Sequence, residues 1–227
     1  MAGVAELADA ADLKSAGAIL VGSSPTLGTR RQSNFPATRK KSNSTTSQES
    51  IMNKKRKGLV QVFTGNGKGK TTAALGTTLR ALGHGLRVYI GFFMKGKYPY
   101  GEFRSLAILP NIDIANYGFR YLTDPAHIKP EERDQAKQAL SAARKAMLSD
   151  RYDLMVLDEI NVASALKLIE PDDVITLIKD KPENVELILT GRYADNKVIE
   201  MADLVTEMVK IKHPFTNGIP ARKGIEY

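Results

Sequence analysis

The residues best suited to chemistry form a glycine- and lysine-rich run at positions 64–72. The run reads Thr64-Gly65-Asn66-Gly67-Lys68-Gly69-Lys70-Thr71-Thr72. Glycines let consecutive backbone N–H groups turn inward around phosphate oxygens, and lysines add positive charge. We expect Lys70 to reach the phosphates and the Thr71 hydroxyl to ligate Mg²⁺. The run therefore predicts a phosphate-binding loop, with Thr64 at the place where such loops usually have their first glycine.

Two acidic residues, Asp158 and Glu159, follow the apolar run 154–157. Near-continuous apolar runs are typical of strands buried in parallel sheets, and a carboxylate at the end of such a strand faces the ligand crevice. Taken alone, the acidic pair could equally cap the next helix. Together with the glycine-rich run it predicts a Mg²⁺ site made by Thr71, Asp158 and Glu159, and it leaves open which acid meets the metal.

Both groups of residues need a sheet that brings them together. The run 59–63 is rich in strand formers, and the apolar spacing of residues 73–82 predicts a helix directly after the loop. Further strands are expected at 87–93, 112–115, 185–190 and 204–210. Further helices are expected at 101–109, 130–149, 161–169, 171–180 and 195–202. The alternation predicts an α/β fold, P-loop NTPase-like and doubly wound, with a mainly parallel sheet and helices on both faces.

Composition removes several kinds of chemistry. The 227 residues include no cysteine and no tryptophan, which excludes thiol nucleophiles, zinc–thiolate sites, iron–sulfur clusters and disulfides. The net charge of +8 suits a polyphosphate or an anionic cofactor as well as DNA, so charge alone does not choose a partner. Because the sequence has no apolar run of about 18 residues, we expect a cytoplasmic protein that does not span a membrane.

Residues 1–51 differ in character from the rest of the chain. From about residue 22 to residue 50 the sequence is rich in Ser, Thr, Asn, Arg and Lys, a composition typical of disorder. This stretch could be a flexible tail or a transit peptide. We favour the hypothesis that residues 3–29 are a transfer-RNA gene read as protein, so that the natural start is Met52 and residues 52–227 form the folded domain. A nucleotide sequence that cannot fold as a cloverleaf there would refute this hypothesis.

Five segments, taken in chain order, resemble the P-loop type of ATP:corrinoid adenosyltransferases of cobalamin biosynthesis and salvage. They are the loop 65–74, Phe93-Met94-Lys95-Gly96-Lys97-Tyr98-Pro99 with Gly101-Glu102, Leu157-Asp158-Glu159, Thr190-Gly191-Arg192, and Lys212-His213-Pro214-Phe215 with Gly218 and Gly224-Ile225-Glu226-Tyr227. The resemblance covers about residues 58–227. Many families share a phosphate loop, whereas the segments around Lys95 and over 212–227 are more specific.

The resemblance implies that a corrinoid reduced to Co(I) attacks the 5′-carbon of ATP and expels triphosphate, with ATP reversed in the loop relative to kinases. It assigns Lys70, Thr71 and Glu159 to catalysis. The implied ATP-binding residues are Gly65, Asn66, Gly67, Lys68, Gly69, Lys70, Thr71, Thr72, Arg80 and, as a weaker candidate, Arg192. A Co(I) nucleophile needs no deprotonation, which agrees with a sequence that offers no obvious general base.

The candidates for facing the corrinoid are Tyr98 and Phe119, whose aromatic rings could exclude water from the reduced metal, and Lys95 of the matched segment. The family often has Trp at position 98 and a Thr-Trp pair where this chain has Arg120-Tyr121. That difference points to a differently tuned corrinoid face or to a different precursor. The choice between cob(I)alamin and cob(I)yrinic acid a,c-diamide stays open. The resemblance also leads us to expect a flavoprotein-type reductant, and a homodimer is one option for the assembly.

Two other functions remain open at this point. A small-molecule kinase or NTPase on the same fold would use Lys70 and Asp158 with an attacking hydroxyl or water, and it would release ADP. The net charge of +8 suggests an ATP-dependent nucleic-acid binder. However, the chain offers one basic run outside the loop, at 54–57, and no basic strand interleaved with aromatic residues. We therefore expect neither nucleic acid nor a membrane as a partner.

Overall fold

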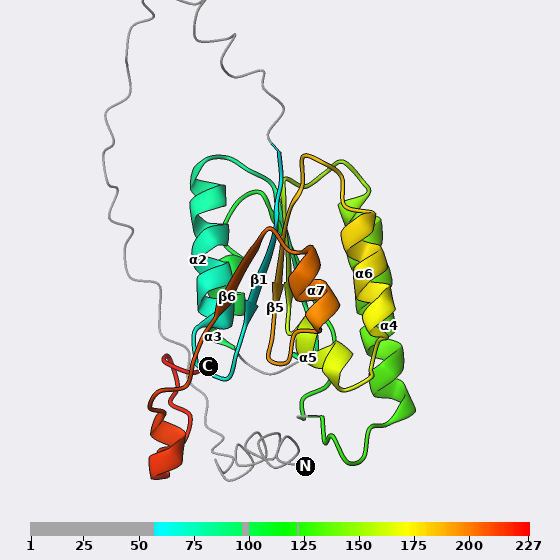
Figure 1. Ribbon diagram of the computed structural model, residues 1–227. Helices are drawn as coiled ribbons and strands as arrows, with labels where there is room; N and C mark the ends of the chain where they lie inside the picture. The colour runs from blue at the N-terminus through cyan, green and yellow to red at the C-terminus, as the bar shows by residue number, and fades with distance from the viewer. Residues whose placement is uncertain (1–56, 97–99, 122) are drawn as a thin grey trace, which may run out of the picture. The chain divides into compact units, whose positions relative to one another are not determined.

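The computed structural model describes residues 57–96, 100–121 and 123–227 (Figure 1). Within these ranges six strands form one parallel sheet in the order β3-β2-β4-β5-β1-β6. The strands are β1 (Val60–Thr64), β2 (Val88–Phe92), β3 (Ile112–Asn116), β4 (Leu154–Asp158), β5 (Glu186–Thr190) and β6 (Leu204–Glu207). The helices are α2 (Lys70–Gly83), α3 (Gly101–Leu106), α4 (Pro130–Met147), α5 (Ile160–Ala165), α6 (Pro171–Lys179) and α7 (Asn196–Met201), with a short 3₁₀ helix, η2 (Pro214–Asn217).

Helices cover both faces of the sheet. Helices α2 and α3 lie on one face, and α4, α5, α6 and α7 lie on the other (Figure 1). Each face has its own hydrophobic cluster: Val156 packs in the cluster that includes Ala74 of α2, and its neighbour Met155 packs in the cluster that includes Met147 of α4. Successive residues of β4 thus point to opposite layers, as the pleat of a strand requires. The predicted α/β fold with a doubly wound parallel sheet is confirmed.

Burial explains the run of apolar residues in the inner strands. Every residue of β2, β4 and β5 is buried, because helices cover both of their faces. By contrast, all four residues of the edge strand β6 are exposed. The predicted strand 204–210 is too long, because β6 ends at Glu207 and the next residues turn across the β1–α2 loop. The predicted helix 161–169 is also too long: α5 ends at Ala165, and Lys167 has a left-handed φ of 56°.

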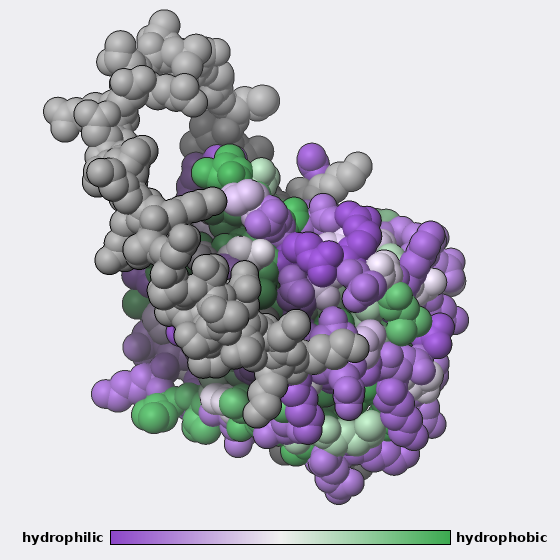
Figure 2. Space-filling model, turned by 90° about the horizontal axis from the view of Figure 1, so that it is seen from above, coloured by the Kyte–Doolittle hydropathy of each residue, from purple (hydrophilic) through white to green (hydrophobic). Residues whose placement is uncertain are grey.

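The described surface gives no sign of a membrane segment. Among the helices of the described ranges, none has both the length and the apolar composition that crossing a bilayer requires. Seen from above, the described surface is largely hydrophilic, with hydrophobic side chains gathered in separate patches (Figure 2). Residues 1–51, predicted to lie outside the folded domain, fall outside the described residues, so this division of the chain stays a prediction.

Candidate active site

The carboxyl ends of the strands bring several polar segments to one edge of the sheet. The loop 65–69 follows β1, Lys95 comes shortly after β2, and Asp158 and Glu159 stand at the end of β4. Thr190 is the last residue of β5, which pairs with both β1 and β4. Because these strands are parallel, their carboxyl ends share the edge where open α/β sheets bind ligands. The structure therefore brings the predicted loop and the predicted acids together.

The loop 65–69 forms a cradle at the start of α2. Gly65 and Gly69 have φ angles of 92° and 119°, a region that residues with a side chain adopt only under strain. The first N–H groups of α2, with their partial positive charge, are directed at the loop. Thr64, in place of the usual first glycine, ends β1, and its hydroxyl accepts a hydrogen bond from the Ala194 N–H (3.3 Å). The local geometry is that of a phosphate-binding loop tied to the segment after β5.

Lys70 is the buried cation of the loop, with 8% of its surface exposed. Its Nζ donates hydrogen bonds to the carbonyl oxygens of Gly65 (2.8 Å) and Gly67 (2.7 Å). Burial lowers the pKa of Lys70, and the nearby Glu159 carboxylate opposes that shift. Since an ammonium group has three N–H donors, the third can meet a phosphate oxygen while two remain on the loop. Lys70 is thus fixed in place by its own loop.

A second lysine, Lys95, forms a buried ion pair beside the loop. Its Nζ lies 2.7 Å from Oδ2 of Asp158 and 3.3 Å from the Thr71 hydroxyl oxygen. Burial favours the neutral form of Lys95, but the Asp158 and Glu159 carboxylates outweigh it and raise the pKa of the ammonium. The structure therefore places Lys95 at the phosphate end of the site. Its predicted contact with the corrinoid stays a prediction.

The oxygen atoms around Lys95 suit Mg²⁺. The Thr71 hydroxyl and the Asp158 carboxylate both contact the Lys95 ammonium, so they already converge on one positive charge. Burial and the neighbouring Asp158 raise the pKa of Glu159, the adjacent acid. Mg²⁺ prefers such hard oxygen ligands and usually takes one or two carboxylates together with substrate phosphates. Thr71, Asp158 and Glu159 thus fit the ion, which stays a prediction.

Thr190 has a place in this site that the sequence did not assign. Its hydroxyl donates to Asp158 Oδ1 (2.6 Å) and accepts a hydrogen bond from the Glu159 N–H (3.1 Å). Glu159 has a φ of 63°, so its backbone needs support from neighbours. The fully buried Thr190 side chain supports the Glu159 backbone and holds the Asp158 carboxylate in place. The available sequence signal was a polar residue that closes the apolar run 187–189.

The two predicted arginines lie in different places. Arg192 follows β5, close enough for its charge to act on both Lys70 and Glu159: burial and then Arg192 lower the pKa of Lys70, whereas at Glu159 burial and Asp158 raise the pKa and Arg192 only opposes them. Arg80 is exposed in the last turn of α2, about 15 Å along the helix axis from Lys70 at 1.5 Å per residue. The structure does not bring Arg80 to the loop, and its predicted contact with ATP has no support there. Asn66 of the loop and Thr72 in the first turn of α2 are both exposed.

Phe119, a predicted corrinoid-facing residue, lies in the segment after β3. Its ring stacks on Tyr121, with centroids 5.2 Å apart and planes at 10°. Gly96 and Gly118 approach closely, because a Cβ on Gly96 would lie 2.3 Å from the Gly118 carbonyl oxygen. The segment of Lys95 and the segment of Phe119 are therefore packed side by side. Tyr98, the third corrinoid-facing candidate, lies outside the described residues.

Comparison with known proteins points to one family. The family model for ATP:corrinoid adenosyltransferase BtuR/CobO/CobP matches residues 56–227. The corrinoid adenosyltransferase of Escherichia coli (strain K12) is 33% identical over 171 residues, covering 75% of this chain and 86% of the relative. Corrinoid adenosyltransferase CobA of Salmonella typhimurium is 37% identical over 174 residues, covering 75% and 86%. The corrinoid adenosyltransferase of Pseudomonas aeruginosa is 38% identical over 176 residues, covering 75% and 84%.

Proposed function

The chain belongs to the ATP:corrinoid adenosyltransferase family, and we propose that it transfers the 5′-deoxyadenosyl group of ATP to the cobalt of a reduced corrinoid. The observation that carries the proposal is the gathering of cations around the phosphate cradle. Lys70 lies on the loop, with the charges of Lys95 and Arg192 close enough to act on it. Such a group of fixed positive charges is suited to a departing triphosphate.

In the proposed reaction the corrinoid Co(I) is the nucleophile. Its electron pair forms the bond to C5′ of ATP, the C5′–O5′ bond breaks, and the oxygen leaves on inorganic triphosphate with the bonding electrons. Cobalt becomes Co(III), and no proton is transferred, so the step requires no general base. The protein's task is to hold the triphosphate and to stabilise the negative charge that grows on the leaving oxygen.

The lysines and arginine have distinct places around the triphosphate. Lys70 would reach it from the loop, Lys95 from the side of Asp158, and Arg192 from the end of β5. Mg²⁺, bound by Thr71, Asp158 and Glu159, would neutralise part of the phosphate charge. Thr190 orients the Asp158 carboxylate with one hydrogen bond and supports the Glu159 backbone with another. The site would therefore hold the leaving group with fixed charges, as preorganised electrostatic catalysis requires.

The proposal extends to substrate form and partners. The corrinoid would be cob(I)alamin or cob(I)yrinic acid a,c-diamide, reduced by a flavoprotein-type partner in the cytoplasm, and the protein could act as a homodimer. The stacked pair Phe119 and Tyr121, beside the segment of Lys95, offers an aromatic surface on which a corrinoid could lie. Water excluded by such a surface could not react with the reduced cobalt.

One anaerobic assay tests the proposal. The full chain is incubated with ATP, Mg²⁺ and chemically reduced cobalamin, and the visible spectrum is followed while the phosphate product is separated by ion chromatography. We expect a cobalt–carbon bond and one triphosphate for each corrinoid consumed. Formation of ADP without a change in the corrinoid would instead support a kinase or NTPase and would overturn the proposed reaction.

A further inference from the structure

A segment that follows β6 lies across the phosphate loop. We call residues 208–227 the strap. At its start the Gly67 N–H donates to the Met208 carbonyl (2.6 Å), and the Met208 N–H donates to the Thr64 carbonyl (2.9 Å). At its other end Tyr227 lies against Gly101 at the start of α3, with its carbonyl carbon 3.9 Å from the site of a Cβ on that glycine. The strap therefore contacts the loop and the neighbouring helix.

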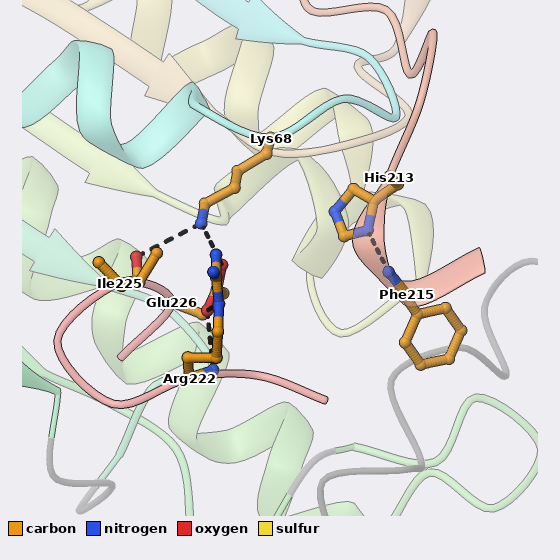
Figure 3. A network of polar contacts seen from close by, with 6 residues as sticks. All are labelled: Lys68, His213, Phe215, Arg222, Ile225 and Glu226. Atoms are coloured by element: carbon orange, nitrogen blue, oxygen red, sulfur yellow. Dashed lines mark hydrogen bonds and ion pairs between the residues drawn. The ribbon is translucent and has the colours of Figure 1, made fainter. Parts of the chain in front are cut away.

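Lys68 of the loop points to the strap rather than to its own loop (Figure 3). Its Nζ lies 2.7 Å from Oε1 of Glu226 and 3.4 Å from the Ile225 carbonyl oxygen. This contact is accessible to water, because 47% of the Lys68 side chain and 21% of the Glu226 side chain are exposed. The two lysines of the loop thus differ: Lys70 donates to backbone carbonyls, whereas Lys68 is paired with a carboxylate.

Arg222 holds the Glu226 carboxylate from the other side (Figure 3). The Arg222 backbone N–H and Nε donate to Oε2 of Glu226 (2.7 and 3.2 Å), and its Nη2 donates to Oε1 (3.0 Å). The hydrogen bonds from Arg222 and from Lys68 lower the pKa of Glu226 to about 2, so the group is an anion at any working pH. If Lys68 moved away, Arg222 would still pair this carboxylate.

We propose that Glu226 competes with the triphosphate group for the Lys68 ammonium, and so weakens the hold of the loop on its product. The inference rests on the proposed function, because it concerns the leaving triphosphate of that reaction. Exchange of partners costs little, since Lys68 is half exposed and Glu226 keeps Arg222. Free triphosphate carries more negative charge than the same group esterified to adenosine, so a site built of fixed cations holds it more tightly. A competing carboxylate therefore favours release of triphosphate.

The test measures binding of inorganic tripolyphosphate to the full chain by isothermal titration calorimetry at low salt without added metal. We expect Glu226→Gln to lower the Kd by about three- to fivefold, the size that loss of a competing exposed ion pair allows. In a Lys68→Met background the same substitution should change the Kd less than about twofold, because Glu226 acts through Lys68. At about 0.5 M salt the difference between wild type and Glu226→Gln should disappear.

Glu207→Gln is the matched control. The Glu207 side chain also borders the loop, beside Gly65, but within the described residues it forms no ion pair with Lys68. It should change the Kd less than Glu226→Gln does, and thermal unfolding checks that each variant is folded. Glu226→Ala serves as a second variant.

Three results would overturn the inference. One is weaker or unchanged binding in both Glu226 variants, which would mean that Glu226 does not compete for Lys68. Another is a Glu226→Gln substitution that lowers the Kd equally in the Lys68→Met background, or a Glu207→Gln substitution that lowers it as much as Glu226→Gln does. Either outcome would indicate a general charge effect. The last is a wild type that binds no tripolyphosphate, which would contradict the proposed role of the loop as well. If that wild-type protein still adenosylated the corrinoid, only this inference would fail. If it did not, the proposed function would fail as well.

Discussion

The buried Lys95–Asp158 ion pair predicts a large loss of stability when its positive charge is removed. The two charged atoms are 2.7 Å apart, Asp158 is fully buried, and 13% of Lys95 is exposed. The substitution Lys95→Met keeps an unbranched side chain against the Phe92 and Tyr100 rings, whose centroids lie 5.6 and 5.2 Å from the ammonium. The Asp158 carboxylate would then stay buried without a cation at Oδ2, although Oδ1 would keep the hydrogen bond from Thr190.

The expected magnitude follows from the burial. Removing one partner of a buried ion pair costs about 3–5 kcal/mol, because the remaining charge stays in a medium that solvates it poorly. In a domain of about 170 residues, each 1 kcal/mol shifts the midpoint by roughly 2–4 °C, so the midpoint should fall by about 10 °C. Urea and thermal unfolding of the full chain without nucleotide, followed by circular dichroism, measure both quantities.

An exposed pair of equal length provides the control. Arg144 Nε also lies 2.7 Å from a carboxylate, that of Asp180, but 52% and 30% of the two side chains are exposed. Arg144→Met should therefore cost about 1 kcal/mol or less. Adding Asp158→Asn to Lys95→Met removes the unpaired charge and should restore part of the lost stability. Equal losses for Lys95→Met and Arg144→Met would refute the view that burial makes the first pair costly to break.

Four further predictions concern the loop and its surroundings. Lys70→Ala should lower kcat in the anaerobic adenosylation assay by about 100-fold or more, because the leaving triphosphate loses a fixed charge, and circular dichroism checks that the variant is folded. Thr190→Val should cost about 1–3 kcal/mol in urea unfolding, since it leaves buried polar groups unpaired, and Thr190→Ser should cost less. Gly67→Ala places a Cβ 2.7 Å from the strap backbone and should weaken ATP binding in calorimetry, whereas the control Gly76→Ala has nothing within 4 Å and should leave it unchanged. Removal of residues 1–51 should leave turnover unchanged in the same adenosylation assay.

The phosphate loop could be predicted from sequence because its determinants are local. Glycines at 65 and 69 are required by φ angles of 92° and 119°, and the helix that follows begins at Lys70. The acids at 158 and 159 were also predictable, since a buried strand in a parallel sheet reads as an apolar run. Because the strands are parallel, the phosphate loop and the two acids must then lie at the same edge of the sheet. Short-range patterns thus predict the fold and the centre of the site.

Contacts that depend on strand order could not be predicted in this way. Thr190 reaches Asp158 because β5 lies between β1 and β4, an order that no local pattern encodes. The contact between Lys68 and Glu226 joins residues 158 positions apart. The family resemblance singled out the segment that contains Lys95. That the Lys95 side chain points toward Asp158, however, depends on the turn after β2. Arg80 is a different case, because the predicted helix directly after the loop already places it about 15 Å along the helix axis from Lys70, and the family resemblance was given more weight than that local signal.

The three lysines around the cradle differ in the partners that a phosphate must replace, and that difference orders their roles. Lys70 is fixed by carbonyl oxygens and can add a phosphate oxygen without losing a carboxylate partner. Separating Lys95 from fully buried Asp158 would leave a charge without solvent, so Lys95 moves only if another cation takes its place. Lys68 can leave Glu226 easily, because Arg222 keeps that carboxylate paired. The cradle should therefore bind its triphosphate first through Lys70, whereas Lys68 governs how readily it lets the product go.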